Sequence, residues 1–291
     1  MTPPPATPAA PGRIRLLALD VDGTVTDSRH EVTEIACRAI DRVRAAGVRV
    51  LLATGRRYRD TLPVAGRLGI DDPLVTATGA LVKRPADHAT LRRAAFPPGV
   101  LQGIVDVIVG AGHEPVLYTD SFAAGFDFHV RSLAVRGRGL GEYLERNRGL
   151  ADVRPDLHVA APADAFAGFA MGPREEMLAL ETSLREAFPG QLALHTIRSP
   201  RYRDWLCEIA PAGVTKWTGV ATLAAGWGIA AHEVCAVGDD VNDLPMLEGA
   251  GLGIAMGNAV DEVRAAVPTV VGSHDGSGLA DVADLVLAGL A

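Results

Sequence analysis

Residues 16–27 read L-L-A-L-D-V-D-G-T-V-T-D. A run of four apolar residues ends at Asp20, and Asp22, Gly23 and Thr24 follow directly, so this segment predicts a buried strand that stops at two acids and a turn. In open parallel sheets, ligands bind beyond the carboxyl ends of the strands, where loops leave the sheet. We therefore expect the chemistry of the protein to begin at Asp20.

The segments that follow alternate between buried strands and amphipathic helices. Residues 48–54 (V-R-V-L-L-A-T) and 74–80 (L-V-T-A-T-G-A) are typical of buried strands, whereas residues 32–46 and 58–68 carry apolar side chains at helical spacing. Near-continuous apolar strands separated by helices indicate a parallel sheet that is covered on both faces. The sequence therefore predicts an α/β fold with a Rossmann-like three-layer core.

The middle third of the chain departs from this alternation. It mixes short strands, hairpins and helices, as α+β domains do, and the alternation of strand and helix returns only after Val214. We therefore expect an α/β core that is split by an inserted α+β cap domain. The predicted division is a disordered proline-rich tail at 1–12, a core formed by 13–85 and 209–291, and the inserted cap at 86–208.

The composition argues against several classes of protein. The chain has 291 residues and a net charge of −7, so it can bury a large core and has no basic excess for binding nucleic acid. No apolar segment approaches the roughly 20 residues of a membrane span, and the first twelve residues lack the features of a secretory signal. We expect a cytoplasmic protein, a monomer or homodimer, whose partner is a small molecule.

Four predicted strands of the core end in polar residues, namely Asp20 and Asp22, Thr54, Thr78 and Gly79, and Asp239 and Asp243. Parallel strands deliver such ends to one edge of the sheet. Several carboxylates in one crevice repel each other unless a positive charge lies among them. A hard cation with oxygen ligands meets that need, and Mg²⁺, which keeps water and a substrate phosphate, fits better than a calcium site made only of protein ligands.

A phosphate group beside this cation needs a fixed positive charge and neutral hydrogen-bond donors. Lys216, one of only two lysines, stands at the start of a predicted helix, and Thr54 and the backbone amides beside glycines supply donors. A carboxylate nucleophile suits phosphoryl transfer because an aspartyl-phosphate splits one displacement into two easier ones. We therefore interpret Asp20 as the nucleophile and Asp22 as the acid and base for the leaving alcohol and the attacking water.

Four motifs occur in the order D-V-D-G-T, A-T-G-R, G-V-T-K and G-D-D-V-N-D. Together they resemble the four motifs of the haloacid-dehalogenase (HAD) superfamily of phosphatases, and the resemblance covers nearly all of the chain after the tail. The insert between the second and third motifs, with A-M-G-N-A at 255–259, resembles the Cof-type branch with a type IIB cap. This resemblance implies a Mg²⁺-dependent phosphatase for small phosphorylated metabolites, first sugar phosphates and next phosphorylated cofactors, with an aspartyl-phosphate intermediate.

The resemblance also implies a role for each motif residue. Asp20 would be the nucleophile and a Mg²⁺ ligand, Asp22 would be the acid/base and bind the metal through its backbone carbonyl, and Asp239 would be the remaining direct ligand. Asp243 would hold metal-bound water or Lys216. The residues implied to contact phosphate or substrate are Gly23, Thr54, Gly55, Lys216, Asn242 and Asn258.

Two residues depart from the family pattern. Thr78 stands where relatives commonly have Asn, which weakens any assignment of a substrate contact at this position. Trp217 stands where they commonly have Gly, which leaves Lys216 intact but suggests different packing beneath it.

Two other functions remain open. A phosphotransferase or phosphomutase would use the same aspartyl-phosphate, and a non-catalytic phosphometabolite-binding protein would keep the same pocket. The intact motifs, Asp22 included, speak against the binding protein. The sequence also leaves open which residues of the insert contact the leaving group, for which the candidates are His129, Arg131, Arg198 and Arg203.

Overall fold

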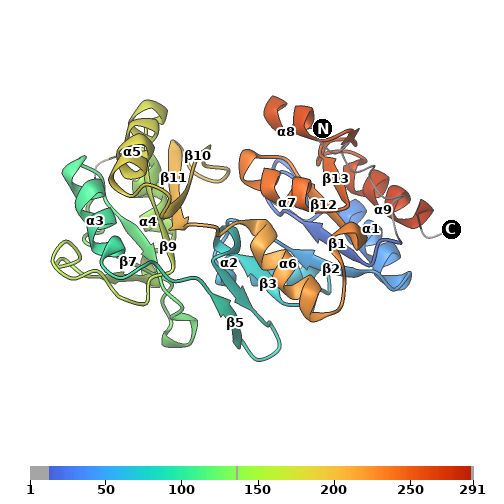
Figure 1. Ribbon diagram of the computed structural model, residues 1–291, viewed down its shortest axis with the longest axis horizontal. Coiled ribbons are helices and arrows are strands. Elements are labelled where there is room, and N and C mark those ends of the chain that lie inside the picture. The colour runs from blue at the N-terminus through green and yellow to red at the C-terminus, as the bar shows by residue number, and fades with distance from the viewer. Residues whose placement is uncertain (1–12, 136, 290–291) are drawn as a thin grey trace, which may run out of the picture.

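The computed structural model describes residues 13–135 and 137–289, so the predicted tail at 1–12 lies outside the described residues. Two groups of helices and strands lie side by side (Figure 1). One group contains both ends of the described chain, and the other contains its middle. No helix in these ranges combines the length and the apolarity that crossing a membrane requires.

The first group is built on a five-stranded parallel sheet with the strand order β14-β13-β12-β1-β2. Its strands are β1 (Leu16–Leu19), β2 (Arg49–Leu52), β12 (Val234–Gly238), β13 (Leu252–Ala255) and β14 (Thr269–Val270). The fully buried β1 lies between β2 and β12. Because Leu19 pairs with Val237, the carboxyl ends of β1 and β12 lie next to each other.

Helices cover both faces of this sheet. They are α1 (Glu34–Ala45), α2 (Tyr58–Arg67), α6 (Lys216–Gly226), α7 (Leu244–Gly249), α8 (Asp261–Ala266) and α9 (Gly278–Ala288). Successive residues of a strand point to opposite faces. Leu17 and Leu19 accordingly pack with α1, α2 and α9, whereas Leu16 and Ala18 pack with α6, α7 and α8. The predicted α/β core with a covered parallel sheet is confirmed.

The second group is built on a six-stranded sheet with the strand order β10-β11-β9-β6-β7-β8. Its strands are β6 (Val116–Tyr118), β7 (Phe128–Val130), β8 (Ala151–Val153), β9 (Ala167–Gly172), β10 (Leu192–Arg198) and β11 (Trp205–Pro211). β7 and β8 pair in parallel, and the other neighbours pair antiparallel.

Helices also flank this second sheet. α3 (Val100–Gly110) and α5 (Arg174–Ala187) pack on the face that includes Ala170 and Cys207. α4 (Arg138–Arg146) packs against Phe169 and Met171. Since Ala170 alternates with Phe169 and Met171 along β9, α4 lies on the opposite face. This α+β arrangement agrees with the predicted fold class.

A smaller antiparallel sheet consists of β3 (Leu74–Thr76), β4 (Leu81–Lys83) and β5 (Thr90–Arg93). β5 lies in the predicted insert but pairs with β4 of the predicted core, and β11 crosses the predicted boundary at 208/209. The precise division into domains therefore stays a prediction. The short 3₁₀ helices are η1 (Ala77–Gly79), η2 (Phe122–Ala124), η3 (Arg148–Leu150), η4 (Ala231–Glu233) and η5 (Val241–Asp243).

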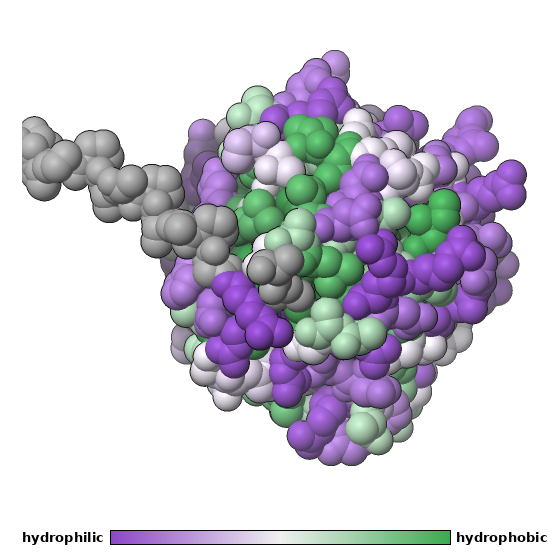
Figure 2. All heavy atoms as spheres, turned by 90° about the vertical axis from the view of Figure 1, so that its right-hand side faces the viewer, coloured by the Kyte–Doolittle hydropathy of each residue, from purple (hydrophilic) through white to green (hydrophobic). Residues whose placement is uncertain are grey.

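The face of the first group that is turned away from the second carries apolar side chains among charged ones (Figure 2). Exposed large hydrophobic residues of its C-terminal part include Val260, Val270 and Leu285. Single exposed apolar residues are ordinary on protein surfaces. The polar residues that the sequence singles out follow the strands instead, at the carboxyl edge of the parallel sheet.

Candidate active site

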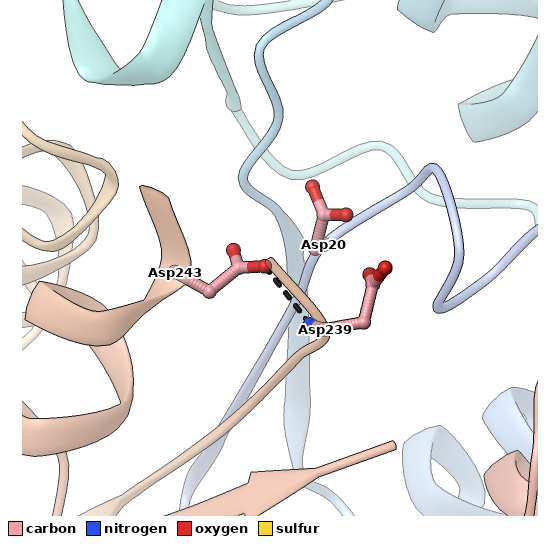
Figure 3. A group of neighbouring side chains, drawn as sticks. All are labelled: Asp20, Asp239 and Asp243. Atoms are coloured by element: carbon pink, nitrogen blue, oxygen red, sulfur yellow. Dashed lines mark hydrogen bonds between the residues drawn. The ribbon is translucent and has the colours of Figure 1, made fainter. Parts of the chain in front are cut away.

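Three carboxylates meet at the carboxyl edge of the parallel sheet. Asp20 follows β1 directly and Asp239 follows β12 directly, and the Asp20 backbone N–H donates to Val237 O at 3.0 Å. Asp243 lies in η5, and its Oδ2 accepts a hydrogen bond from the Asp239 backbone N–H at 3.0 Å. One oxygen of each carboxylate lies within 4.8 Å of the other two, and the side chains face one common space (Figure 3).

Lys216 supplies a positive charge to this cluster. It is the first residue of α6, whose N-terminus is capped by Thr215. Its Nζ donates to Asp20 Oδ1 and to Asp243 Oδ1, both at 2.7 Å, and only 1% of the residue is exposed. The start of α6 therefore holds a buried ammonium between two acids that are far apart in the sequence.

The charges of the cluster do not cancel. Burial raises the pKa of Asp20 to about 7 against the opposing charge of Lys216. Burial, together with the charges of Asp20 and Asp243, raises the pKa of Asp239 well above its ordinary value. When all three carboxylates are ionised, they and the ammonium carry a net charge of −2, which one divalent cation balances. Carboxylate oxygens are ligands that Mg²⁺ prefers, so the donor chemistry of this cluster fits the predicted metal.

Asp22 does not join the three-carboxylate cluster. Its carboxylate accepts hydrogen bonds from Arg56 Nε at 2.7 Å and Arg56 Nη2 at 2.6 Å, and His30 Nδ1 lies 3.5 Å away. Burial alone would raise the pKa of Asp22, but hydrogen bonds from Arg56 and His30 lower it far below its ordinary value. Asp22 is therefore ionised in this arrangement. It can accept a proton, but it can donate one only after Arg56 has moved away.

Thr54 and Gly55 follow β2 at the same edge of the sheet. Thr54 is 1% exposed, and its backbone N–H donates to Val75 O at 2.9 Å, which joins this loop to β3. Its Oγ1 accepts a hydrogen bond from the Arg56 backbone N–H at 3.1 Å. Within the described ranges no acceptor is recorded for the hydroxyl proton of Thr54, so this hydroxyl can donate to a ligand. Its role toward phosphate stays a prediction.

The two predicted asparagines differ in their contacts. Asn258 donates from Nδ2 to Gly23 O at 2.8 Å and accepts at Oδ1 from the His274 backbone N–H at 2.9 Å, so its amide joins two loops. Asn242 lies in η5 and is 5% exposed. Its Oδ1 is buried and has no hydrogen-bond partner among the described residues. Asn242 therefore has more capacity than Asn258 to bind a ligand.

The turn after β1 passes close to Asp239 and therefore requires a glycine at position 23. Its φ is +79°, and a Cβ at this position would lie 2.2 Å from Asp239 Oδ2. For the phosphatase reaction that the resemblance implies, we predict that Gly23→Ala displaces this carboxylate and lowers kcat/KM by about 10²-fold. The left-handed backbone should add a loss of stability of roughly 1–2 kcal/mol. Phosphate release and urea unfolding measure the two effects.

Gly47→Ala is the matched control for this prediction. Gly47 has a φ of +81°, but a Cβ there would meet no atom within 4 Å. Both variants should lose the stability that the left-handed backbone costs, and only Gly23→Ala should lose activity. Equal activity of the two variants would show that the contact with Asp239 is irrelevant to the reaction.

A cavity of about 470 Å³ joins the carboxylate cluster to the six-stranded sheet. Alternate residues of β9, β10 and β11 line it, namely Phe169 and Met171, His195 and Ile197, and Leu206 and Glu208. Because alternate residues of a strand point to the same face, the face opposite α3 and α5 closes the cavity. A cavity of this size accommodates a small organic ligand.

The residues that line the cavity are not the ones that the sequence offers as contacts for the leaving group. The described lining includes none of the four candidates in the insert, namely His129, Arg131, Arg198 and Arg203. His129 Nδ1 lies 2.9 Å from Asp152 Oδ2 instead, and the guanidinium of Arg131 pairs with the carboxylate of Glu114. Arg201 and Tyr202 of the β10–β11 turn line the cavity in their place. The period-2 pattern of β10 and β11 was the available signal, but it does not reveal which face meets the core.

A model of the haloacid dehalogenase-like hydrolase family matches residues 17–282 of the chain. Stress response protein YhaX of Bacillus subtilis is 29% identical over an alignment of 276 residues, and the match covers 91% of this chain and 91% of the relative. The 5-amino-6-(5-phospho-D-ribitylamino)uracil phosphatase YitU of Bacillus subtilis is 26% identical over 266 residues, which are 91% of this chain and 94% of the relative.

Solved structures share the fold over nearly the whole chain. A haloacid dehalogenase-like hydrolase from Bacteroides thetaiotaomicron has a TM-score of 0.77 at 21% identity and covers 94% of this chain and 99% of its own. The HAD subclass IIB sugar phosphatase BT4131 has a TM-score of 0.75 at 19% identity and covers 93% and 98%. These neighbours agree with an α/β core that carries an inserted cap.

Proposed function

The chain belongs to the haloacid dehalogenase-like hydrolases, and on this premise we propose that it is a Mg²⁺-dependent phosphatase of small phosphorylated metabolites. The observation that carries the proposal is the buried pair of Asp20 and Lys216, which lies beside Asp239 where the cavity meets the parallel sheet. The relative YitU is named a phosphatase of a phosphoribityl compound, and BT4131 a sugar phosphatase. Sugar phosphates are therefore the first substrates to test, and phosphorylated cofactors the next.

In the proposed mechanism, Asp20 attacks phosphorus with Oδ2, since Oδ1 accepts from Lys216. A bond forms between Oδ2 and phosphorus, the ester O–P bond breaks, and the leaving oxygen takes a proton from Asp22. Asp22 then takes a proton from the water that attacks the phosphoaspartate, which restores Asp20 and releases phosphate. The first proton transfer requires that Arg56 has left Asp22 and that this carboxyl has gained a proton.

Asp20 and Asp239 would hold the Mg²⁺ directly, together with the backbone carbonyl of Asp22, and Asp243, whose Oδ1 accepts from Lys216, would hold metal-bound water or Lys216. When bound, the cation offsets the charge of the transferring phosphoryl group. Lys216 keeps Asp20 oriented and pairs with a phosphoryl oxygen, and Thr54 donates to another. We also propose, as the sequence predicts, a cytoplasmic monomer or homodimer.

Release of phosphate from p-nitrophenyl phosphate tests the proposed function. The protein is expected to turn this ester over with Mg²⁺ and to stop when excess EDTA is added. A phosphotransferase would instead move the phosphoryl group to an added acceptor alcohol in preference to water. A phosphometabolite-binding protein would release no phosphate from any monoester, which would contradict the proposal.

Mg²⁺ is expected to raise Tm, and to raise it more at pH 8 than at pH 5. The pKa of Asp20 is about 7 in the folded chain against 3.8 for an ordinary Asp, so the folded state binds this proton more tightly than the unfolded state. Without metal, the contribution of Asp20 to stability therefore falls as pH rises from about 4 to about 7. Binding of Mg²⁺ to the ionised carboxylates offsets this loss, and at low pH protons compete with the metal.

Thermal unfolding with excess MgCl₂ or EDTA at the two pH values measures this linkage. The difference in Tm between the two additions should be larger at pH 8. An equal or larger difference at pH 5 would contradict metal binding by carboxylates with raised pKa values.

A further inference from the structure

Glu208 is a carboxylate in the cavity that does not belong to the metal-binding cluster. It lies on β11, the strand that leads from the six-stranded sheet back to α6, and it lines the cavity. Its Oε2 accepts a hydrogen bond from Thr78 Oγ1 at 3.1 Å. A carboxylate repels a phosphate dianion, so binding of the phosphoryl group does not explain why Glu208 lines the cavity.

The Thr78 hydroxyl is brought to Glu208 by an unusual backbone. Ala77, Thr78 and Gly79 follow one another with φ values of 47°, 55° and 97°. The left-handed region is costly for a β-branched residue such as Thr. A Cβ at Gly79 would lie 2.0 Å from Thr215 O, so this turn is packed tightly against the N-cap of the helix that begins with Lys216. The position of Thr78 is therefore coupled to the catalytic lysine.

Asn242 lies beside this pair. A Cβ built at Gly55 would be 3.1 Å from Glu208 Oε1, 3.4 Å from Thr78 Oγ1 and 4.0 Å from Asn242 Nδ2, so the three side chains gather around this glycine. Asn242 is 5% exposed and lines the same cavity, and its buried Oδ1 has no hydrogen-bond partner among the described residues. An acceptor left without a donor in a buried site is costly unless a ligand supplies the donor.

The balance of donors and acceptors limits what such a ligand can be. Thr78 satisfies one of the several acceptor positions of Glu208, and Asn242 Oδ1 adds another acceptor. A phosphate dianion offers only acceptors, whereas each hydroxyl of a leaving alcohol offers one O–H donor. Burial raises the pKa of Glu208, and the charge of Lys216 and the hydrogen bond from Thr78 oppose the rise.

We propose that Glu208, oriented by Thr78 and flanked by Asn242, accepts hydrogen bonds from hydroxyl groups of the leaving alcohol and thereby selects phosphate monoesters of polyhydroxylated alcohols. This inference rests on the proposed function and assigns the residue that sets its specificity. If Glu208 had only a structural role, it would join β11 to the turn at Thr78, and kcat/KM for hydroxylated and plain alkyl esters would not depend on it differently.

Two esters of equal chain length separate these roles. Sorbitol 6-phosphate carries a hydroxyl on every carbon that is not esterified, and hexyl phosphate carries none. The unaltered protein is expected to favour sorbitol 6-phosphate by at least about tenfold in kcat/KM, because a single hydrogen bond to a charged group contributes at least that factor. Glu208→Gln preserves shape and removes the charge, so it should reduce this preference by about tenfold.

Glu186→Gln is the matched control, because Glu186 is an exposed residue of α5 in the insert. It should leave the ratio of the two kcat/KM values unchanged. Thermal unfolding of both variants verifies that they are folded. If Glu208→Gln does not fold, Glu208→Asp, which keeps the charge on a shorter side chain, is measured in its place and should also reduce the ratio.

Each outcome has one meaning. No preference for sorbitol 6-phosphate in the unaltered protein, with p-nitrophenyl phosphate still hydrolysed, would overturn the inference and leave the proposed function intact. A preference that Glu208→Gln retains in full would overturn the assignment to Glu208. No hydrolysis of any of the three esters would instead overturn the proposed function.

Discussion

Asp20→Asn is expected to lower kcat/KM for p-nitrophenyl phosphate by at least about 10³-fold, which corresponds to about 4 kcal/mol of transition-state free energy. The amide cannot attack phosphorus as a carboxylate does, so no aspartyl-phosphate forms. It also removes one negative charge from the cluster of Asp20, Asp239 and Asp243 at the proposed Mg²⁺ site. Phosphate release at saturating Mg²⁺ measures the loss.

Asp41→Asn is the control for this substitution, because Asp41 is an exposed residue of α1. It should keep full activity, and both variants should unfold in one cooperative transition. If Asp20→Asn were folded and kept more than a tenth of the activity, Asp20 would not be the nucleophile.

Lys216→Met is expected to reduce both stability and activity. Lys216 Nζ is buried between Asp20 and Asp243, and removing one partner of a buried ion pair costs about 3–5 kcal/mol because the remaining charges lose their compensation. The variant should also lose at least about 10²-fold in kcat/KM, since a fixed donor to the reacting group is gone. Urea unfolding in EDTA and phosphate release in Mg²⁺ measure the two losses.

The other lysine of the chain provides the comparison. Lys83 is also buried, and its Nζ contacts Asp120 Oδ1 at 2.5 Å and Thr90 Oγ1 at 2.9 Å. Lys83→Met should be destabilised as well but should retain activity when folded. If both variants lost activity in proportion to their stability, Lys216 would have only a structural role.

The acids and the lysine of the site could be predicted from the sequence because a simple rule of topology governs them. β1 and β12 are parallel neighbours, so Asp20 and Asp239, which directly follow them, must lie at one edge of the sheet. The cap at Thr215 fixes Lys216 at the start of its helix. For these residues, local pattern and strand order suffice.

The contacts that complete the site could not be predicted in this way. Arg56 stands in a recognised motif, but its pairing with Asp22 depends on side-chain conformation rather than on periodicity. Thr78 was visible as a departure from the family pattern, whereas its partner Glu208 comes from a strand 130 residues away. Which face of that strand meets the core depends on how the two sheets are arranged, and no local pattern specifies it.

The most direct test of the account is to trap the phosphorylated enzyme. The protein is mixed with Mg²⁺ and substrate, quenched in acid during turnover, and digested for mass spectrometry. We predict one phosphoryl group on the peptide that contains Asp20, and none when Asp20→Asn is treated alike. Turnover without a phosphorylated peptide, or with the group on a different residue, would contradict the account.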